Sequence, residues 1–264
     1  MRLAGVIGWP VAHSLSPRLH AYWLKEHGID GAYVKLPVRP EDIASVLRGL
    51  RQAGFRGVSV TMPHKEAAFA LAHRVDARAA EAGAVNQLVF HDDGSMEGLN
   101  TDVPGLAASL RDAGVNVAGK PVVLLGAGGA SRAALVALRA MGASEIRLLN
   151  RTEGRSGARS LAHWAEAARD VALVVNATSA GMKGAPSLAL DLAQLPKDAA
   201  VCDIVYNPLE TEFLKRAHGQ GLKTVDGLGM LMYQAAPAFE AFFGVAPKVT
   251  PGLRRTLEEA LAHG

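Results

Sequence analysis

The chain has 264 residues, of which 49% are hydrophobic and 20% are charged, and its net charge is +3. This length suffices for two domains that each bury a core, and the composition is typical of a soluble globular protein. The Lys and Arg residues are scattered without a basic run, which favours anionic small molecules over nucleic acid as ligands and excludes a polybasic binding segment.

The single cysteine, Cys202, excludes an internal disulfide. It lies in the apolar run 199–205, so we expect a buried thiol in a reducing, cytoplasmic setting. No apolar stretch approaches the roughly 18 residues that a membrane span needs. The first 12 residues superficially resemble a signal peptide, but two glycines and a proline interrupt them, which favours a first strand and a turn.

The first third of the chain alternates between strand and helix patterns and predicts an α/β unit. Strands are expected at 3–7, 32–38, 57–61, 84–90 and 96–99, and helices at 17–27, 41–53 and, in shorter pieces, between 65 and 82. Ser16 is expected to cap the first helix, with Pro17 at its first position. Asp93-Gly94 should form the turn between the last two strands.

A second α/β unit is expected after a connecting helix that begins near Val103. Its strands lie near 122, 146, 173, 201 and 223, separated by helical patterns, which predicts a parallel sheet with right-handed crossovers. Two final helices are expected at 228–243 and 250–262.

A glycine turn follows the first strand of this second unit. It reads Gly126-Ala127-Gly128-Gly129-Ala130 and precedes a helical stretch, the order typical of a dinucleotide site. Gly126 permits a tight turn, Gly128 lets the pyrophosphate approach the backbone, and the helix from Gly129 offers free N–H groups. The sixth position of the motif is Ser131, where Gly or Ala is usual. Glycines alone would also fit an ordinary turn.

The segment after the next strand indicates which dinucleotide binds. NAD-binding proteins place an Asp or Glu there, whereas this chain has Asn150, Arg151 and Thr152, with Arg155 close behind. A guanidinium suits a phosphate, and a carboxylate would repel one. The predicted cofactor is therefore NADP(H).

Two residues are candidates for moving a proton. Lys65 follows a buried strand and Pro63 at the start of a helix, at the strand edge where α/β sheets bind ligands. Asp102 lies at the junction of the two units and would hold the Lys65 ammonium. Alternatively, Lys65 is a solvated surface lysine and Asp102 caps the helix that follows it.

Other polar residues lie next to these candidates or at the first helix. Ser14 and Ser16 at a helix start could bind a carboxylate, and His13 and His64 are expected to pack or to form hydrogen bonds. No metal-ligand spacing, G-x-S-x-G elbow or P-loop is present, so hydrolase and kinase functions lose their main support.

Together these residues make the chain similar, nearly end to end, to the shikimate dehydrogenase family. The matching segments include Val60-Thr61-Met62-Pro63-His64-Lys65, Ala84-Val85-Asn86, Asn100-Thr101-Asp102, the glycine turn with Asn150-Arg151-Thr152, Asp203-Ile204-Val205-Tyr206-Asn207-Pro208, and Asp226-Gly227-Leu228-Gly229-Met230 leading to Gln234. The resemblance implies an α/β fold with two α/β domains: a substrate domain of residues 1–101 and 230–264, a Rossmann-type NADP-binding domain of residues 102–229, and an active site in the cleft between them.

The resemblance also implies the activity and the role of each site residue. The expected reaction is the reversible reduction of 3-dehydroshikimate to shikimate with NADPH, with Lys65 and Asp102 as the catalytic pair and no metal. Shikimate would be held by Ser14, Ser16, Thr61, Asn86, Tyr206 and Gln234. NADP(H) would contact Gly126, Ala127, Gly128, Gly129, Ala130, Asn150, Arg151, Thr152, Arg155, Ile204 and Gly227. A monomer or homodimer without nucleic-acid or membrane partners is expected.

The chain departs from the family pattern at two positions. The family usually has Asn where this chain has Ser59, and the shorter side chain is expected to loosen hydrogen bonding around Thr61. Trp9 stands where a smaller or polar residue is usual, and it is expected to pack. The alternatives are an NAD-dependent quinate/shikimate dehydrogenase, a folate or acyl-tRNA oxidoreductase of similar plan, and a regulator that binds NADP without catalysis.

Overall fold

The computed structural model describes residues 1–263, which form two compact units. Unit 1 contains residues 1–102 and the chain from Met232 onward, and unit 2 contains Val103–Leu231. The predicted limits lie one and two residues earlier. Asp102 falls in unit 1, and its carboxylate is bonded to Lys65 and Asn86 of that unit. The second limit falls inside a continuous helix, α9 (Gly227–Phe243), where the sequence has no break to mark it.

Unit 1 is built on a mixed six-stranded sheet in the order β2-β1-β3-β5-β6-β4. The strands are β1 (Arg2–Gly8), β2 (Gly31–Pro37), β3 (Phe55–Val60), β4 (Arg74–Val75), β5 (Gln87–Phe90) and β6 (Met96–Leu99). β1 pairs in parallel with β2 and β3, whereas β3, β5 and β6 pair antiparallel. Because β1 and β3 are parallel neighbours, the residues that follow them lie at the same edge of the sheet.

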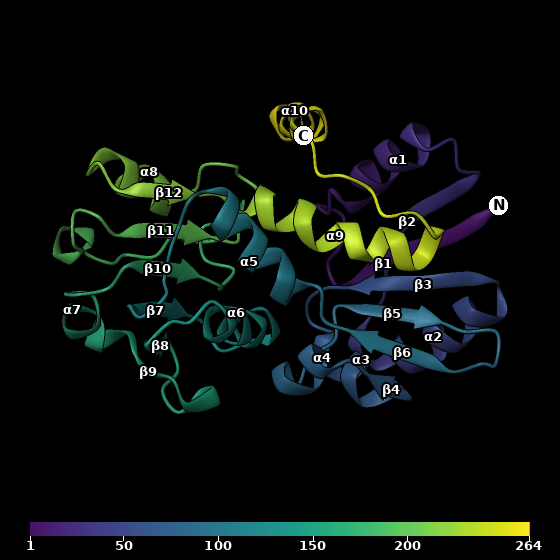
Figure 1. The fold of residues 1–264 in the computed structure, drawn as a ribbon. Helices are drawn as coiled ribbons and strands as arrows, with labels where there is room; N and C mark the ends of the chain where they lie inside the picture. The colour runs from purple at the N-terminus through teal and green to yellow at the C-terminus, as the bar shows by residue number, and fades with distance from the viewer. Residues whose placement is uncertain (264) are drawn as a thin grey trace. The chain divides into compact units, whose positions relative to one another are not determined.

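Helices cover both faces of this sheet (Figure 1). They are α1 (Ser16–Glu26), the short η1 (Pro40–Asp42), α2 (Ile43–Gln52), α3 (Lys65–Leu71), α4 (Ala77–Ala82), the unit 1 part of α9, and α10 (Pro251–Ala262). The prediction that Ser16 caps α1 is wrong, because Leu15 is already helical and occupies the N-cap position. The side chain of Ser14 instead accepts the N–H of Ser16 at 3.3 Å.

Two different cores hold the two faces of this sheet. On one face, aliphatic residues of α2, α3 and α4 such as Ile43, Leu47 and Ala68 pack with strand residues such as Val58. The other face carries a cluster of rings from α1, β2 and α9, comprising His20, Trp23, Tyr33, Phe239 and Phe243. This ring cluster fixes α9 against the sheet.

The histidine in the ring cluster is expected to make the stability of unit 1 sensitive to acid. His20 is 1% exposed and stacks on Tyr33 with ring centres 3.8 Å apart. Burial lowers the pKa of His20 to about 3, below the value of 6.5 for an exposed histidine. Between these pH values the unfolded chain binds the proton more tightly than the folded chain does. The contribution of neutral His20 to the free energy of unfolding is therefore complete above pH 6.5 and is lost as the pH falls toward 3.

His20→Phe keeps a ring in the stack but removes this titration. The free energy of unfolding is measured with urea at pH 7.5 and at pH 5. Below pH 6.5 it should fall by up to about 1.4 kcal/mol per pH unit more in the wild type than in the variant. Equal losses in both proteins would mean that His20 does not carry the effect.

Unit 2 is built on a six-stranded, wholly parallel sheet in the order β12-β11-β10-β7-β8-β9. The strands are β7 (Pro121–Leu125), β8 (Glu145–Asn150), β9 (Arg159–Ser160), β10 (Leu173–Asn176), β11 (Ala200–Asp203) and β12 (Lys223–Val225). The helices are α5 (Asp102–Asp112), α6 (Gly129–Ala140), α7 (Trp164–Ala167) and α8 (Glu212–Gly219), with short helical turns η2 (Arg155–Gly157), η3 (Leu161–His163) and η4 (Leu192–Gln194).

The strand order of unit 2 reverses at β7, which has β8 on one side and β10 on the other. Open α/β sheets bind ligands beyond the carboxyl ends of the strands at such a point. The glycine turn directly follows β7. Unit 2 therefore has the doubly wound arrangement expected of a Rossmann-type domain.

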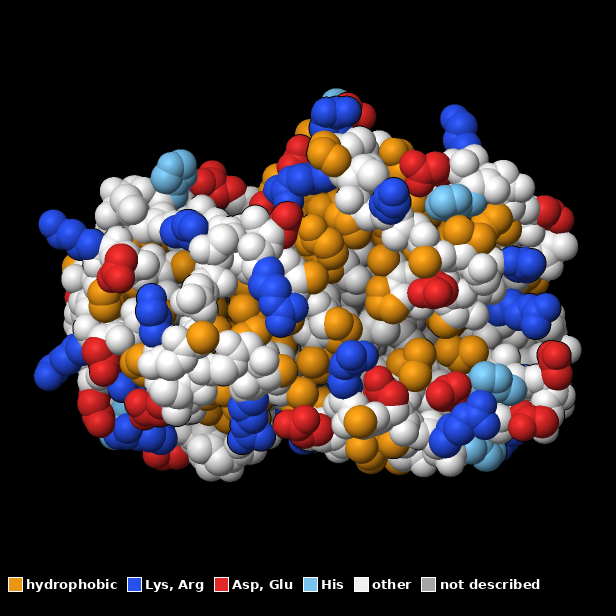
Figure 2. All heavy atoms as spheres, in the orientation of Figure 1, with side chains coloured by type: hydrophobic (Ala, Val, Ile, Leu, Met, Phe, Trp, Pro, Cys, Tyr) orange, Lys and Arg blue, Asp and Glu red, His pale blue; other side chains and the backbone are white. Residues whose placement is uncertain are grey.

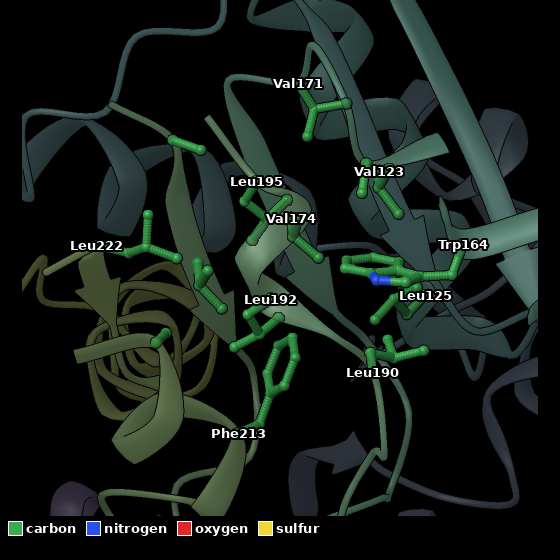
Figure 3. Packing of buried hydrophobic residues seen from close by; sticks show 14 of the residues in the cluster. Val123, Leu125, Trp164, Val171, Val174, Leu190, Leu192, Leu195, Phe213 and Leu222 are labelled. Atoms are coloured by element: carbon green, nitrogen blue, oxygen red, sulfur yellow. The ribbon is translucent and has the colours of Figure 1, made fainter. Parts of the chain in front are cut away.

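A large apolar core lies on one face of the unit 2 sheet (Figure 3). Trp164 and Phe213 are its largest side chains, and the Trp164 ring nitrogen donates to the carbonyl of Asp191 at 2.7 Å. Cys202 is buried as expected, and burial raises the pKa of its thiol. No helix among residues 1–263 combines the length and apolar character needed to cross a membrane. On the visible faces, basic and acidic side chains are interspersed (Figure 2).

Candidate functional site

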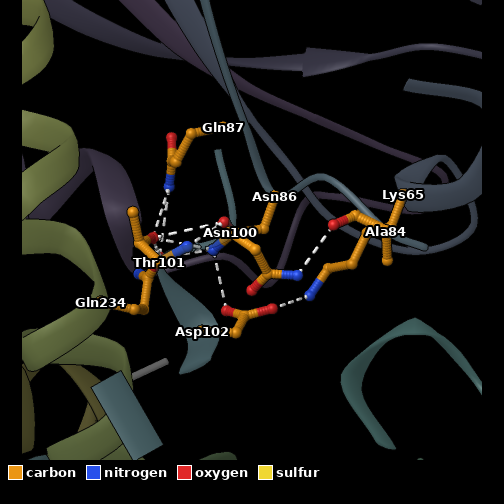
Figure 4. A network of polar contacts seen from close by, with 8 residues as sticks. All are labelled: Lys65, Ala84, Asn86, Gln87, Asn100, Thr101, Asp102 and Gln234. Atoms are coloured by element: carbon orange, nitrogen blue, oxygen red, sulfur yellow. Dashed lines mark hydrogen bonds and ion pairs between the residues drawn. The ribbon is translucent and has the colours of Figure 1, made fainter. Parts of the chain in front are cut away.

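An ion pair between Lys65 and Asp102 is the centre of the polar site in unit 1. The Lys65 Nζ atom lies 2.5 Å from Asp102 Oδ2, and the two side chains are only 15% and 8% exposed. The other carboxylate oxygen, Oδ1, accepts a hydrogen bond from Asn86 Nδ2 at 2.9 Å. Both oxygens of Asp102 are thus held, and its carboxylate has a fixed orientation (Figure 4).

The backbone holds Lys65 in place at the start of α3. The Lys65 carbonyl accepts the N–H of Val85 at 3.0 Å, which ties it to the residue before Asn86. The preceding residue, His64, is 1% exposed, and its Nε2 is 2.8 Å from the carbonyl of Val38. The hydrogen-bonding role predicted for His64 is confirmed, and Lys65 is not the solvated lysine of the alternative interpretation.

Amide side chains extend the network beyond Asp102. The Asn86 amide nitrogen also faces Thr101 Oγ1 at 2.9 Å and Gln234 Oε1 at 3.3 Å. The Gln87 amide nitrogen contacts the same two oxygens at 3.4 and 3.3 Å. The site therefore brings together four of the predicted site residues: Lys65 at the start of α3, Asn86 directly before β5, Asp102 at the start of α5, and Gln234 in α9.

The remaining unit 1 candidates lie where β1 and β3 end. Ser14, in the turn after β1, is 8% exposed, and Ser16, the first residue of α1, is 7% exposed. Thr61 directly follows β3, and its backbone is bonded to Ile7 and His64. Because Ile7 pairs with Val60 in parallel, these residues share one sheet edge with the segment that leads to Lys65. They are held by contacts separate from the amide network.

The glycine turn of unit 2 has the geometry needed to bring a ligand close to the backbone. Gly126 has a φ of +115°, and a side chain there would meet the backbone of Ala177 at 3.1 Å. Gly128 caps α6, and a Cβ placed on it would have no heavy atom within 4 Å. Gly129 and Ala130 form the first turn of α6, whose N–H groups and positive dipole end suit an anion. The cradle is therefore open at Gly128.

The serine at the sixth motif position has a structural explanation. Ser131 is 2% exposed, and its hydroxyl donates to the carbonyl of Gly126 at 2.6 Å. The small side chain permits close packing of α6 on β7, and the hydrogen bond compensates for burying the hydroxyl.

The segment after β8 is linked to the glycine turn. Ser156 donates to the carbonyl of Ala127 at 3.3 Å. Within the segment the Asn150 amide donates to the carbonyl of Thr152 at 2.9 Å, which closes a local turn, while the side chains of Arg151 and Arg155 are exposed. The two cations therefore lie on a loop tied to the glycine cradle.

The loops after β10 and β11 are organised by a buried carboxylate. Asp203 is fully buried and accepts hydrogen bonds from Asn176 Nδ2, Thr211 Oγ1 and the Val205 N–H at 2.7 to 3.0 Å. Burial raises the pKa of Asp203 to about 6, with the three donors acting in the opposite direction. This residue holds the backbone on which the candidates Ile204 and Tyr206 lie, a role that the sequence analysis did not identify.

Gly227 is required by packing, because a Cβ there would overlap the carbonyl of Ile204.

The packing predicted for Trp9 is wrong. Its side chain is 45% exposed, since the chain leaves the sheet at Gly8, and the Arg39 guanidinium lies 5.6 Å from the ring centre. The described residues contain no group of three or more His, Cys, Asp or Glu side chains placed to hold a metal ion.

Sequence comparisons identify relatives over nearly the whole chain. Residues 6–88 match the family model of the shikimate dehydrogenase substrate binding domain. A protein named shikimate dehydrogenase (NADP(+)) from Acidiphilium cryptum is 52% identical over 265 residues, which cover 97% of this chain and 95% of that protein.

Solved structures give the same relationship. Shikimate 5-dehydrogenase from Thermus thermophilus, in complex with NADP(H) and shikimate, is 38% identical with a TM-score of 0.87, covering 100% of this chain and 99% of that one. Quinate dehydrogenase from Corynebacterium glutamicum, in complex with NAD, is 30% identical with a TM-score of 0.87, covering 99% of each chain.

Proposed function

The chain belongs to the shikimate dehydrogenase family, and on that premise we propose that it catalyses the reversible NADPH-dependent reduction of 3-dehydroshikimate to shikimate, a step of chorismate and aromatic amino acid biosynthesis. The observation that carries the proposal is the buried Lys65–Asp102 ion pair next to the amides of Asn86 and Gln234. The cytoplasmic location and the monomeric or homodimeric state stay predictions from the sequence.

In this proposal Lys65 moves the proton. Reducing the ring carbonyl creates an alkoxide, and the Lys65 ammonium gives that oxygen a proton to form the hydroxyl group. In the oxidation direction the Lys65 amine takes the proton back. Asp102 holds the Lys65 nitrogen through Oδ2, while Asn86 fixes the other carboxylate oxygen, so the amine keeps its direction throughout the cycle.

The other polar residues of unit 1 would bind the substrate. Ser14 and Ser16, close to the N-terminus of α1, suit the carboxylate, and Thr61, Asn86 and Gln234 suit the ring hydroxyls. We assign Tyr206 of unit 2 to the same task. Sites that hydrogen-bond each hydroxyl discriminate strongly, because an analogue without one leaves a buried group unpaired.

The residues of unit 2 fit a dinucleotide phosphate. The open cradle at Gly128 and the N–H groups of α6 suit the pyrophosphate, and Arg151 and Arg155 suit the adenosine phosphate. Alongside them we assign Ala127, Asn150 and Thr152 to the cofactor, with Ile204 and Gly227 near the nicotinamide. NADPH, when bound, supplies the hydride.

Two glycine variants separate cofactor binding from folding. Gly128→Ala should unfold within a few degrees of the wild type, because its Cβ meets nothing and only the preference for Gly over Ala at the N-cap of α6 is lost, yet bind NADP about five- to a hundredfold more weakly because the methyl group occupies the cradle. Gly227→Ala should be destabilised by about 1–3 kcal/mol, because its Cβ meets the Ile204 backbone. Thermal melts and titration with NADP measure both effects. Normal NADP affinity in Gly128→Ala would contradict the cradle.

The proposed activity is tested by incubating the purified protein with shikimate and NADP and following the absorbance of the reduced nicotinamide. Rapid reduction that requires both compounds is expected. No reduction with shikimate would refute the proposal.

The second candidate function is that of an NAD-dependent quinate dehydrogenase, because a quinate dehydrogenase in complex with NAD has a similar structure. Arg151 and Arg155 favour NADP, since neither has a phosphate to bind in NAD. Exchanging quinate for shikimate and NAD for NADP in the same assay distinguishes the two activities.

A further inference from the structure

A chain of buried hydrogen bonds leads from β2 to Gln234. The Tyr33 hydroxyl donates to Ser59 Oγ at 2.5 Å, and Ser59 donates to Gln87 Oε1 at 2.9 Å. The Gln87 Nε2 atom then faces Gln234 Oε1 at 3.3 Å. Tyr33, Ser59 and Gln87 are 7%, 8% and 0% exposed, so water cannot readily replace these contacts.

The direction of every bond in this chain follows from one backbone group. The N–H of Thr101 can only donate, and it bonds to Asn86 Oδ1 at 2.7 Å. Asn86 must therefore present its nitrogen to Gln234, which in turn presents its oxygen. Gln87 then has to turn its own nitrogen toward that oxygen and its oxygen toward Ser59.

The far end of the chain is rigid. Tyr33 is stacked on His20 with an angle of 3° between the rings, which fixes the direction of its hydroxyl. The Ser59 hydroxyl accepts one bond from Tyr33, and its single proton goes to Gln87 Oε1 because the orientation of the Gln87 amide makes that oxygen the acceptor.

We propose that Gln87 and Ser59 are positioning residues for substrate binding: they hold the Gln234 amide with its oxygen toward Asn86 and Gln87, in the one orientation in which it binds shikimate. The bond from Ser59 to Gln87 Oε1 and the bond from Gln87 Nε2 to Gln234 Oε1 together fix the orientation of both amides. This inference rests on the proposed function, in which Gln234 binds the substrate.

The test compares variants that break the chain at different bonds. Ser59→Ala removes the donor to Gln87 Oε1, and Gln87→Met removes the donor to Gln234. Each should raise the KM for shikimate about five- to a hundredfold, the range expected when a buried polar group loses its partner. The KM for NADP and kcat should stay within about twofold. Calorimetric titration with shikimate should show the same loss of affinity.

Tyr33→Phe is the matched control, since it removes a buried hydroxyl from the same chain but leaves the Ser59 proton on Gln87. Tyr33→Phe should keep the wild-type KM for shikimate. Ser59→Thr, which keeps a hydroxyl at this position, should have a KM for shikimate close to the wild-type value and well below that of Ser59→Ala. The proposal is overturned if Ser59→Ala and Gln87→Met bind shikimate normally, or if all variants including Tyr33→Phe weaken shikimate and NADP alike. A wild type that fails to oxidise shikimate would instead refute the proposed function.

Discussion

Replacing Lys65 with alanine is expected to lower kcat about a hundredfold to ten-thousandfold while changing the KM for shikimate by only a few fold. Proton transfer by a positioned side chain typically contributes a factor of this size. The serines, Thr61 and the amides that would bind the ring remain in place, so substrate affinity should persist. Steady-state kinetics with shikimate and NADP measure both constants.

Asp102→Asn is the matched variant for this test. The amide has the shape of the carboxylate but carries no charge to hold the Lys65 ammonium, so kcat should fall while the fold is kept. A Lys65→Ala protein with wild-type kcat would show that Lys65 does not move the proton. A large rise in the KM for shikimate with unchanged kcat would instead assign Lys65 to substrate binding.

Replacing both Arg151 and Arg155 with alanine should lower kcat/KM for NADP about 10- to 100-fold for each arginine that contacts the phosphate. Charge-assisted hydrogen bonds of this kind contribute about 1.5–3 kcal/mol. The kcat/KM for NAD should change little, because NAD lacks that phosphate. The ratio of the two values, measured under identical salt conditions, is the quantity to compare.

Arg159→Ala is the control for this pair. Arg159 is an exposed arginine on β9, a few residues after the same loop, and it pairs with Glu166. Its removal should leave the NADP/NAD ratio unchanged. If the double variant loses kcat/KM equally with NADP and with NAD, the loop shapes the glycine cradle but the two arginines do not bind the adenosine phosphate.

Much of the fold was predictable because its strands and helices have clear periodicity. All five predicted strands of the second unit are present, and the turn at Asp93-Gly94 joins β5 and β6 as expected. β4 and β9 were missed because two residues are too few to show a pattern. The prediction for Trp9 was wrong because an aromatic residue just beyond the end of a strand can lie on the surface.

The site was predictable where the chemistry is local in sequence. The glycine turn, Arg151 and Lys65 each stand in a short recognisable segment. The roles of Ser59, Gln87 and Asp203 depend on bonds to residues distant in the sequence, such as Tyr33, 26 residues from Ser59, and Asn176, 27 residues from Asp203. No local pattern indicates such pairs, although the unusual serine at Ser59 marked the position.

The most direct test of the proposed reaction is its stoichiometry in the reduction direction. The purified protein is mixed with 3-dehydroshikimate and NADPH in weakly buffered solution with a pH indicator, and shikimate, NADPH and proton uptake are measured together. Equal amounts of NADPH oxidised, proton consumed and shikimate formed are predicted. NADPH that stays reduced in the presence of 3-dehydroshikimate, or oxidation of NADPH without formation of shikimate, would refute the proposed reaction.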